Sequence, residues 1–580
     1  GDTSTLADPT GLPRTSLYDG IGRLTEVREP SPQPYGASSL DRLLISYDSL
    51  GNVTQTQLGY SATGVPFTLV RRQRHEYDQA GFLKRSFDSN GQETLYDYDP
   101  NGQLARTVDA LGRTTLRTYD THGRLKTHHD AMGQSTQFGY SVMGQLASVT
   151  DPRNVTTTYT YNGFGERVGE ASPDSGTTTY TYDVAGRPAT MTRAGGLVTT
   201  FAHDALGRMT SVSAQRPAGG TDSRSFIYDS CSNGVGRLCR INEAWGYQAF
   251  EYTATGRLAS RTDSVHGSVA TQGFTYDTAD RLTRISHPGN VLVDYHYDAS
   301  SAVSQVRLSQ SGTWHTLATQ LRREPLRGAL RQLDQGNGRI RHEYRDLDGR
   351  LSRIHTPDIQ QNWLDFNAAN EIIGLEIESS AVRYQNYGYD ALGRLTGVSG
   401  SQSQSFGYDA NGNRTSHGWG GATDGYSVAG ASNRLTAVTG PRARSFGHDV
   451  RGNRSSETVG GVTASYSYDG FNRLSRVSRP GSPSVCKSTG ECVSLWAGLS
   501  EYAYNAQGQR VSKRQENPSG TQTALVRYHY GADGRLAFET QPTSAGVARH
   551  YVWLEGRLIG LVAGSQVYRV HGDHLGRPES

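Results

Sequence analysis

Tyr119-Asp120-Thr121-His122-Gly123-Arg124-Leu125 is the stretch of the chain that decides the fold. The same form, YDxxGRL, returns at Tyr389-Asp390-Ala391-Leu392-Gly393-Arg394-Leu395. Tyrosines also stand at positions 77, 98, 119, 140, 161 and 182, each 21 residues after the one before. A signature with a fixed spacing predicts a repeat architecture.

One unit of this repeat is interpreted as a β-hairpin. Tyr favours strands, Asp bonds to its own backbone, and Gly four residues after Tyr supplies the left-handed conformation that closes a type I turn with a bulge. Where that Gly is replaced, Asn472 or Asp280 stands in its place, and both residue types tolerate positive φ. We call the turns that follow the repeat tyrosines the YD turns. A second set, the alternate turns, lies between them, as at Asp109-Ala110-Leu111-Gly112. Each unit therefore predicts two strands of about six residues.

The predicted fold class is all-β, an antiparallel ribbon of hairpins. Hydrophobic residues make up only 34% of the chain and mean hydropathy is -0.61, yet there are 33 Tyr and 69 Gly. Such a chain has little material for a packed core, while its aromatic residues and period distinguish it from a disordered one. The length corresponds to roughly 55 strands and a ribbon of about 260 Å. Sheets beyond ~10 strands curl or split, so the ribbon is expected to coil into a spiral, hollow shell or part of one.

The repeat predicts one continuous structural unit over residues 1–580. It is regular over 18–308, irregular over 309–375 and regular again over 376–580. Neither a linker nor a change of composition separates these parts, so we expect no division into independent domains.

Charge and hydropathy exclude several function classes. The net charge is +3, with 58 Lys and Arg against 55 Asp and Glu, which makes no case for nucleic acid or an anionic membrane. The sequence has no apolar run of membrane-spanning length and begins without the basic and apolar regions of a signal peptide. We therefore expect neither a membrane span nor a leader of the Sec type.

Four cysteines form two close pairs, Cys231 with Cys239 and Cys486 with Cys492. The first pair brackets a repeat turn, so a disulfide across a hairpin is the favoured interpretation, and reduced thiols are the alternative. The second pair is interpreted as a small clasped loop between repeats. Two closed pairs favour an oxidising compartment.

No motif in the sequence indicates catalysis. The phosphate-binding, zinc-protease, nucleophile-elbow and dinucleotide signatures are all missing. His128-His129-Asp130 is the densest ionisable cluster, but adjacent strand residues point to opposite faces, which argues against a metal site. We therefore expect no enzyme activity, no cofactor and no metal. The Arg that follows the turn Gly is expected to pair with Asp or to stack on Tyr, with contact to a glycan or polyanion as the alternative.

The repeated YDxxGRL signature resembles that of the Rhs/YD-repeat family, which includes bacterial Rhs toxins, the C components of Tc toxins, wall-associated polymorphic toxins and teneurin shells. The segment Asp573-His574-Leu575-Gly576-Arg577-Pro578 is similar to the DHLGxP segment late in bacterial Rhs cores. Tyr551-Val552-Trp553 is a typical lead-in to it. This resemblance points to the core of a bacterial Rhs polymorphic toxin.

The resemblance implies a β-ribbon cocoon that encapsulates a C-terminal toxin domain in cis. It also implies delivery by a type VI or related secretion route in bacterial competition, and hence a secreted or cell-surface location. Family members release the toxin by cleavage at a DPxGL motif after the DHLGxP segment. We expect that element and the toxin to be missing here, because the chain ends at Ser580. Asp8-Pro9-Thr10-Gly11-Leu12 has the same letters but precedes a repeat, so it is interpreted as a turn.

Three function classes follow from these observations. An encapsulating scaffold for a toxin is favoured by the DHLGxP-like tail. A cell-surface adhesion or carbohydrate-binding module is the alternative, because arrays of exposed tyrosine also suit glycans. An enzyme within the irregular region 309–375 is the third, and no residue pattern supports it. The sequence does not identify the toxin cargo, the delivery components or any glycan.

Overall fold

The computed structural model describes residues 2–7, 13–31, 39–62, 65–298, 301–326, 328–378, 382–401, 403–482, 484–486, 492–541 and 546–577. Within these ranges every regular element is a β-strand. The turn predicted for Asp8 to Leu12 and the last position of the DHLGxP-like segment, Pro578, lie outside the described residues.

The strands fall into a first coil, β1–β27, and a second coil, β28–β52. The first coil consists of β1 (Thr3–Ala7), β2 (Pro13–Tyr18), β3 (Leu24–Pro30), β4 (Leu40–Tyr47), β5 (Val53–Ala62), β6 (Val65–Tyr77), β7 (Leu83–Phe87), β8 (Glu93–Tyr98), β9 (Leu104–Val108), β10 (Thr114–Tyr119), β11 (Leu125–His129), β12 (Ser135–Tyr140), β13 (Leu146–Thr150), β14 (Thr156–Tyr161), β15 (Arg167–Ser172), β16 (Gly176–Tyr182), β17 (Pro188–Arg193), β18 (Leu197–His203), β19 (Met209–Gln215), β20 (Thr221–Tyr228), β21 (Leu238–Glu243), β22 (Gly246–Tyr252), β23 (Leu258–Val265), β24 (Ser268–Tyr276), β25 (Leu282–His287), β26 (Val291–Tyr297) and β27 (Val303–Gln310).

The second coil consists of β28 (Thr313–Arg323), β29 (Leu330–Asp334), β30 (Ile340–Arg345), β31 (Leu351–Thr356), β32 (Gln360–Phe366), β33 (Ile372–Glu378), β34 (Val382–Tyr389), β35 (Leu395–Gly400), β36 (Gln404–Tyr408), β37 (Arg414–Trp419), β38 (Ala422–Val428), β39 (Leu435–Thr439), β40 (Arg444–His448), β41 (Arg454–Val459), β42 (Val462–Tyr468), β43 (Leu474–Arg479), β44 (Ser484–Cys486), β45 (Cys492–Ser494), β46 (Gly498–Tyr504), β47 (Arg510–Glu516), β48 (Gln522–Tyr530), β49 (Leu536–Gln541), β50 (Gly546–Leu554), β51 (Arg557–Ala563) and β52 (Gln566–Arg569).

Each strand pairs antiparallel with its neighbour along the chain, as in a continuous meander. Among the residues that the structure describes, fifty strands form one sheet, and β44 and β45 form a separate pair that interrupts the step from β43 to β46. The irregular region 309–375 belongs to the same ribbon, as the strands β28 to β33. The expected all-β ribbon is confirmed.

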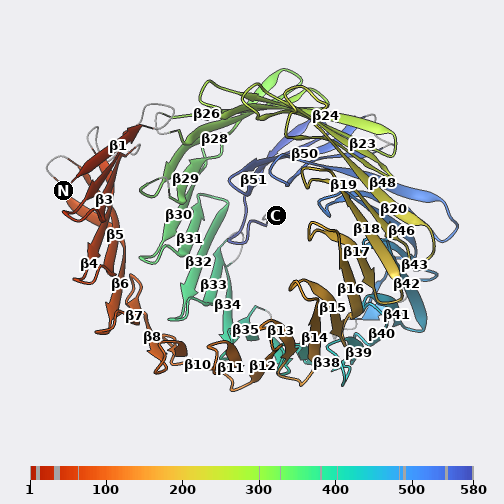
Figure 1. Ribbon diagram of the computed structural model, residues 1–580. Helices are drawn as coiled ribbons and strands as arrows, with labels where there is room; N and C mark the ends of the chain where they lie inside the picture. The colour runs from red at the N-terminus through yellow and green to blue at the C-terminus, as the bar shows by residue number, and fades with distance from the viewer. Residues whose placement is uncertain are drawn as a thin grey trace.

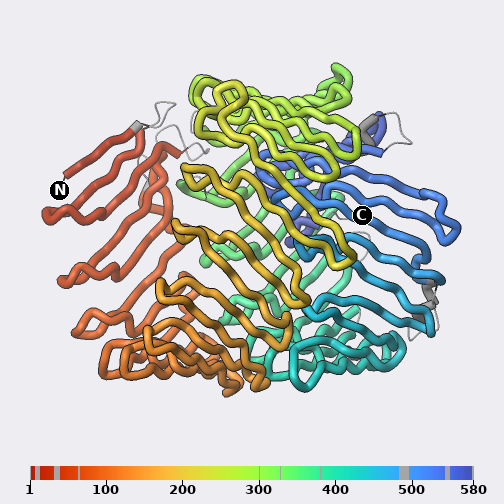
Figure 2. The backbone as a smooth tube through the Cα atoms, turned by 45° about the vertical axis from the view of Figure 1, so that its right-hand side comes forward, coloured from red at the N-terminus to blue at the C-terminus, as the bar shows by residue number. Residues whose placement is uncertain are grey.

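The ribbon coils as a spiral. Figure 1 shows that it travels once around a ring and then repeats the circuit, with β29–β34 following the course of the earlier strands. Figure 2 shows the two coils side by side, the first in red to green and the second in green to blue. The predicted spiral is confirmed, and its physical cause is the twist that strands accumulate across a long sheet.

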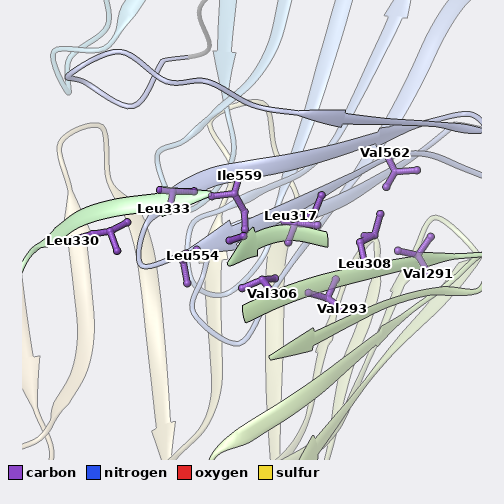
Figure 3. Packing of buried hydrophobic residues seen from close by; sticks show 12 residues of the cluster. Val291, Val293, Val306, Leu308, Leu317, Leu330, Leu333, Leu554, Ile559 and Val562 are labelled. Carbon is purple, nitrogen blue, oxygen red and sulfur yellow. The ribbon is translucent and has the colours of Figure 1, made fainter. Parts of the chain in front are cut away.

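Apolar packing is concentrated where the second coil ends. Side chains from β26, β27, β28 and β29 meet side chains from β50 and β51 in one buried cluster (Figure 3). Leu317 at its centre is fully buried, and a Cβ on Gly560 would lie 2.6 Å from it. Glycine at 560 therefore allows β51 to approach β28 closely. A local dry core of this kind was not expected from the composition.

Candidate functional site

The YD turns owe their shape to the aspartate side chain. Asp120 Oδ1 accepts hydrogen bonds from the backbone N–H groups of His122 and Arg124 at 2.9 and 3.0 Å. Its Oδ2 accepts one from Arg124 Nε at 2.7 Å, and Gly123 has a φ of 77°. The Arg124 side chain and the two N–H groups lower the pKa of Asp120 to about 2. The Asp, Gly and Arg of the motif thus shape the turn together.

The tyrosine and the arginine join one repeat to the next. Arg124 lies over the ring of Tyr140, with its guanidinium carbon 4.4 Å from the ring centroid. The Tyr140 hydroxyl donates to the Leu125 carbonyl at 2.8 Å, and the Tyr119 hydroxyl donates to the Leu104 carbonyl at 2.7 Å. Register shifts by one residue before Tyr119, which then pairs with Leu125. The contacts recur every 21 residues and so account for the spacing.

The same geometry appears in the second coil. Gly393 has a φ of 72°, and Arg394 Nε donates to Asp390 Oδ2 at 2.6 Å. Arg394 also donates to the carbonyl of Asp409 in the next YD turn, at 3.0 Å. The YD turn of this unit is made by Tyr389, Asp390, Gly393, Arg394 and Leu395, with Tyr389 paired with Leu395. The expected pairing of arginine with aspartate and its stacking on tyrosine are both present.

The segment resembling DHLGxP is itself a turn of the YD type. Asp573 Oδ1 accepts hydrogen bonds from the N–H groups of Leu575 and Arg577, both at 2.8 Å, and Gly576 has a φ of 76°. Arg341 holds the segment by donating to the carbonyl of Gly572 at 2.7 Å. His574 lies within the turn, and Pro578 lies beyond the described residues. Asp573 and Gly576 thus shape a turn that Arg341 holds at the carbonyl of Gly572.

The structure joins Cys231 and Cys239 in a disulfide with a Cα–Cα distance of 5.4 Å. Cys239 lies in β21, whereas Cys231 lies in the loop that follows β20. The bond therefore ties a loop to a strand, and does not connect two strands of a hairpin as expected. The backbones of Cys486 and Cys492 lie opposite each other in β44 and β45. Their side chains are outside the described part of the molecule, and so is the disulfide predicted for them.

A seam joins the two coils, and sequence reasoning did not find it. Asn90 N–H donates to Asp348 Oδ1 at 3.1 Å, and Arg113 Nη1 donates to Glu371 Oε1 at 2.7 Å. Both pairs are 258 residues apart in sequence. Asn90 and Arg113 belong to alternate turns of the first coil, whereas their partners belong to YD turns of the second coil. The alternate turns of the first coil therefore pack against the YD turns of the second coil.

The most densely bonded part of the seam surrounds Asn433. Its side-chain amide nitrogen donates to Asp151 Oδ2 at 2.9 Å, and its backbone N–H donates to Asp174 Oδ1. Arg153 donates to the carbonyl of Ser432 at 2.7 Å and to Asn433 Oδ1 at 2.9 Å. Partly buried bonds of this kind fix the angular register of one coil on the other. A spacing of about 258 residues between complementary turns is the signal that could have revealed this seam.

A cluster of buried rings closes another part of the seam. His529 stacks on Phe538 with ring centroids 4.4 Å apart, and His550 lies 5.5 Å from His287 of the first coil. Burial lowers the pKa of His287 to about 4. Burial, assisted by His287, lowers the pKa of His550 to about 3. The imidazoles of His287 and His550 are therefore neutral packing groups at neutral pH.

The described side chains hold no cluster of three or more His, Cys, Asp or Glu able to bind a metal ion. In those same residues no helix has the length and apolarity to cross a membrane. His128 and His129 sit next to each other in β11, where successive side chains alternate between faces.

A comparison with protein-family models matches the RHS repeat at residues 77–114, 119–155, 144–177, 182–221 and 387–423. The chain thus carries RHS repeats in these segments. The matched segments coincide with the most regular YD turns of the chain. A search of curated proteins found no match.

Solved structures share the fold of this RHS-repeat chain. A Tc holotoxin pore of Photorhabdus luminescens is 16% identical, with a TM-score of 0.78, and the match covers 100% of this chain and 34% of that one. A TcdB2-TccC3 structure without its hypervariable C-terminal region is 15% identical with a TM-score of 0.68, over 94% and 34% of the two chains. A TcdB2-TccC3-Cdc42 structure is 15% identical, with a TM-score of 0.68, over 98% and 37%. This chain therefore spans about a third of the length of these proteins.

Proposed function

We propose that this chain forms part of the wall of a hollow shell that encloses a toxin polypeptide. The observation that carries the proposal is the width of one full circuit of the ribbon. The alternate turn after β13 meets the YD turn after β36, so one circuit takes 23 strands. At ~4.8 Å per strand the circumference is about 110 Å and the diameter about 35 Å. A barrel of ~8 strands is filled by its own side chains, whereas one of this width leaves room for a cargo.

The end of the second coil supports the same proposal. Figure 1 shows β51 and the chain after it running inward from the wall toward the middle of the ring. Arg341 and Gln335 hold this segment through the carbonyls of Gly572 and Val570, at 2.7 and 2.9 Å. A polypeptide that continued from there would enter the space inside the wall. The cargo would then be a domain of the same polypeptide.

The role proposed for the chain is that of a scaffold and not of a catalyst. The likeness to Tc toxin structures supports a place outside the producing cell, with a delivery component as a further partner. The regular turns and their seam supply rigidity, because each turn is bonded to its neighbour along the ribbon and, on one edge, to the next coil.

The test is the protection of a passenger from protease. A small, unstructured passenger is fused after Ser580, and in a matched control the same passenger is fused before Gly1. The proposal predicts that limited proteolysis removes the N-terminal passenger quickly and the C-terminal passenger slowly. Equal rates for the two fusions, with the wall intact, would contradict it.

A further inference from the structure

An exposed row of aromatic and charged side chains crosses the neighbouring strands β30 to β34 of the second coil. Its members face one another in register across the ribbon, in the order Tyr344, Arg353, Trp363, Glu376 and Tyr384. We call this row the aromatic ladder. The exposed fractions of its three rings are 40%, 39% and 56% in the same order. Large exposed rings gathered on adjoining strands are typical of an interaction surface.

The ladder lies on the outer face of the wall. Arg341 and Glu343 of β30 point to the opposite face from Tyr344, because side chains alternate along a strand. Arg341 donates to the carbonyl of Gly572 at 2.7 Å, and Arg557 Nη2 donates to Glu343 at 2.8 Å. These partners belong to β51 and to the chain after it, which run inward from the wall (Figure 1). The ladder therefore points away from the interior, where a separate molecule can reach it.

The ladder presents the edges of its rings to solvent. Arg353 lies between two rings, with its guanidinium carbon 5.2 Å from the Tyr344 centroid and 4.0 Å from the Trp363 centroid. Gln361 fixes that guanidinium by accepting a hydrogen bond from Nη2 at 2.6 Å. Each of the two rings thus has one face covered, which disfavours ligands that stack on ring faces, such as nucleic-acid bases. The surface is suited instead to a ligand whose apolar groups fit between ridges at a regular spacing.

The spacing of the ridges matches one conformation of a polypeptide. The rings occur on every second strand, so at ~4.8 Å per strand they are about 9.6 Å apart along the ribbon. A polyproline II helix has three residues per turn and rises ~3.1 Å per residue, so its side chains repeat at about 9.3 Å. From Tyr344 to Tyr384 the two spacings differ by only about 0.6 Å in total. Proline-rich segments in this conformation bind to aromatic grooves.

The polar groups of the ladder also complement such a segment. Among the described residues, neither the Trp363 Nε1–H nor the Tyr344 hydroxyl has a hydrogen-bond partner. The carbonyls of a polyproline II helix make no internal hydrogen bonds and can accept from both. Glu376 lies in the ladder, and Glu378 lies beside it in β33, where Gln361 donates to it at 2.6 Å. These carboxylates favour a basic residue in the ligand and disfavour a phosphate backbone.

We infer that the aromatic ladder binds a proline-rich segment of another protein in the polyproline II conformation, with a basic residue of that segment beside Glu376 and Glu378. The segment runs across the strands, and about six of its residues span the ladder. The inference goes beyond the proposed shell and does not depend on it. Three of the five ladder residues belong to the irregular region 309–375, so the site is built where the repeat departs from its pattern.

The experiment is fluorescence anisotropy of the full chain with a labelled peptide of three Pro-Pro-Leu triplets followed by two arginines. We expect saturable binding. Trp363→Ala and Tyr384→Ala should each weaken the binding at least about tenfold, because aromatic anchors carry most of the energy of such interfaces. Phe164→Ala, which removes an exposed ring from a YD turn of the first coil, should bind the peptide as the parent chain does.

A charge reversal tests the direction of the segment and the role of the carboxylates. Glu378→Lys should weaken binding of the arginine peptide about fivefold, and it should strengthen binding of a peptide that ends in two glutamates by a similar factor. Equal affinities of Glu378→Lys and the parent chain for both peptides would overturn the placement of the basic residue.

Circular dichroism separates a lost site from a lost fold, because each variant must keep the strand spectrum and unfolding midpoint of the parent chain. If Trp363→Ala does not fold, Tyr384→Ala decides the question, since it changes the most exposed ring of the ladder. The inference is overturned if the peptide does not bind, or if the ladder variants bind it as well as Phe164→Ala does. It is also overturned if a peptide with alanine at every proline position binds equally well, or if a thymidine decanucleotide displaces the peptide.

Discussion

The two edges that carry YD turns differ in what covers them. In the second coil the YD turns are seated against the alternate turns of the first, as where Arg113 bonds Glu371 and Asn433 bonds Asp151. In the first coil the tips of the YD turns stand in solvent, and Phe164 and Val184 are 93% and 109% exposed. The internal bonds of the turn are the same on both edges. The YD signature therefore stabilises each turn by itself, and the variable tip residues decide whether a second coil can be seated on it.

The largest difference in the free energy of unfolding between the seam and the free edge is expected when a phenylalanine is replaced by alanine. Phe538 is fully buried between His529 and the imidazoles of His287 and His550, so Phe538→Ala should lower the free energy of unfolding by about 3–5 kcal/mol. Phe164→Ala on the free edge should change it by less than about 0.5 kcal/mol. Urea unfolding followed by tryptophan fluorescence measures both. Similar losses for the two variants would contradict the contrast.

Acid should open the seam before it affects the turns of the free edge. The pKa of His287 in the folded chain is about 4 and that of His550 about 3, both below the 6.5 of an unperturbed imidazole. The unfolded chain therefore binds more protons, and the stability from these groups is present above pH 6.5 and is lost as pH falls toward 4 and below. For each factor of ten by which the folded chain binds a proton more weakly than the unfolded chain, acid lowers the free energy of unfolding by about 1.4 kcal/mol.

Unfolding midpoints measured from pH 7 to pH 4 check this dependence. His550→Phe, which keeps an aromatic ring, should flatten the curve over that range. Asp120→Asn removes a carboxyl whose pKa is about 2, and so it should leave the slope between pH 7 and about pH 5 unchanged, because that group contributes only below this range. An unaltered slope in His550→Phe would show that the imidazole cluster does not control the response.

An aspartate on the seam should contribute more to the stability of the folded chain than an aspartate on the free edge. Asp409 bonds its own turn through Asn411 N–H and Asn413 N–H at 3.0 and 2.9 Å, and it also pairs with Arg153 across the seam at 3.2 Å. Asp409→Ala should cost about 1–3 kcal/mol. Asp120→Ala breaks only the bonds within its own turn and should lower the midpoint of thermal unfolding by less. Differential scanning calorimetry of the two variants decides the order, and the reverse order would refute it.

The smallest effects are expected at the valine tips. Val450 of the second coil lies against Gly195 of the first, where an added Cβ would lie 3.2 Å from the valine side chain, whereas Val184 is fully exposed. Val184→Ser should change stability by less than about 0.5 kcal/mol, with Val450→Ser slightly more costly. Thermal unfolding of the pair provides the comparison. A larger loss at Val184 would mean that the first coil's free edge is covered in solution.

Local chemistry made the ribbon predictable. Asp120, Gly123 and Tyr119 act within one turn or between adjacent repeats, so a 21-residue period was enough to predict hairpins, bulges and coiling. The seam was not predictable in the same way, because its partners are 258 residues apart and no local signal links Arg113 to Glu371. Cys239 was correctly predicted as the disulfide partner of Cys231. Cys231 lies in a loop and not in the facing strand, because the loop before β21 is longer than a repeat turn.

The most direct test of the spiral is a disulfide engineered across the seam. In the chain carrying both Asn90→Cys and Asp348→Cys, the new cysteines replace two residues that are hydrogen-bonded across the seam. These two residues are 258 positions apart in the sequence. A mismatched chain, with Asn90→Cys and Asn370→Cys, moves the second thiol to the next YD turn. Mild oxidation followed by peptide mass spectrometry should find the first cross-link in high yield and almost none of the second. Equal yields, or the mismatched bond alone, would contradict two stacked coils in this register.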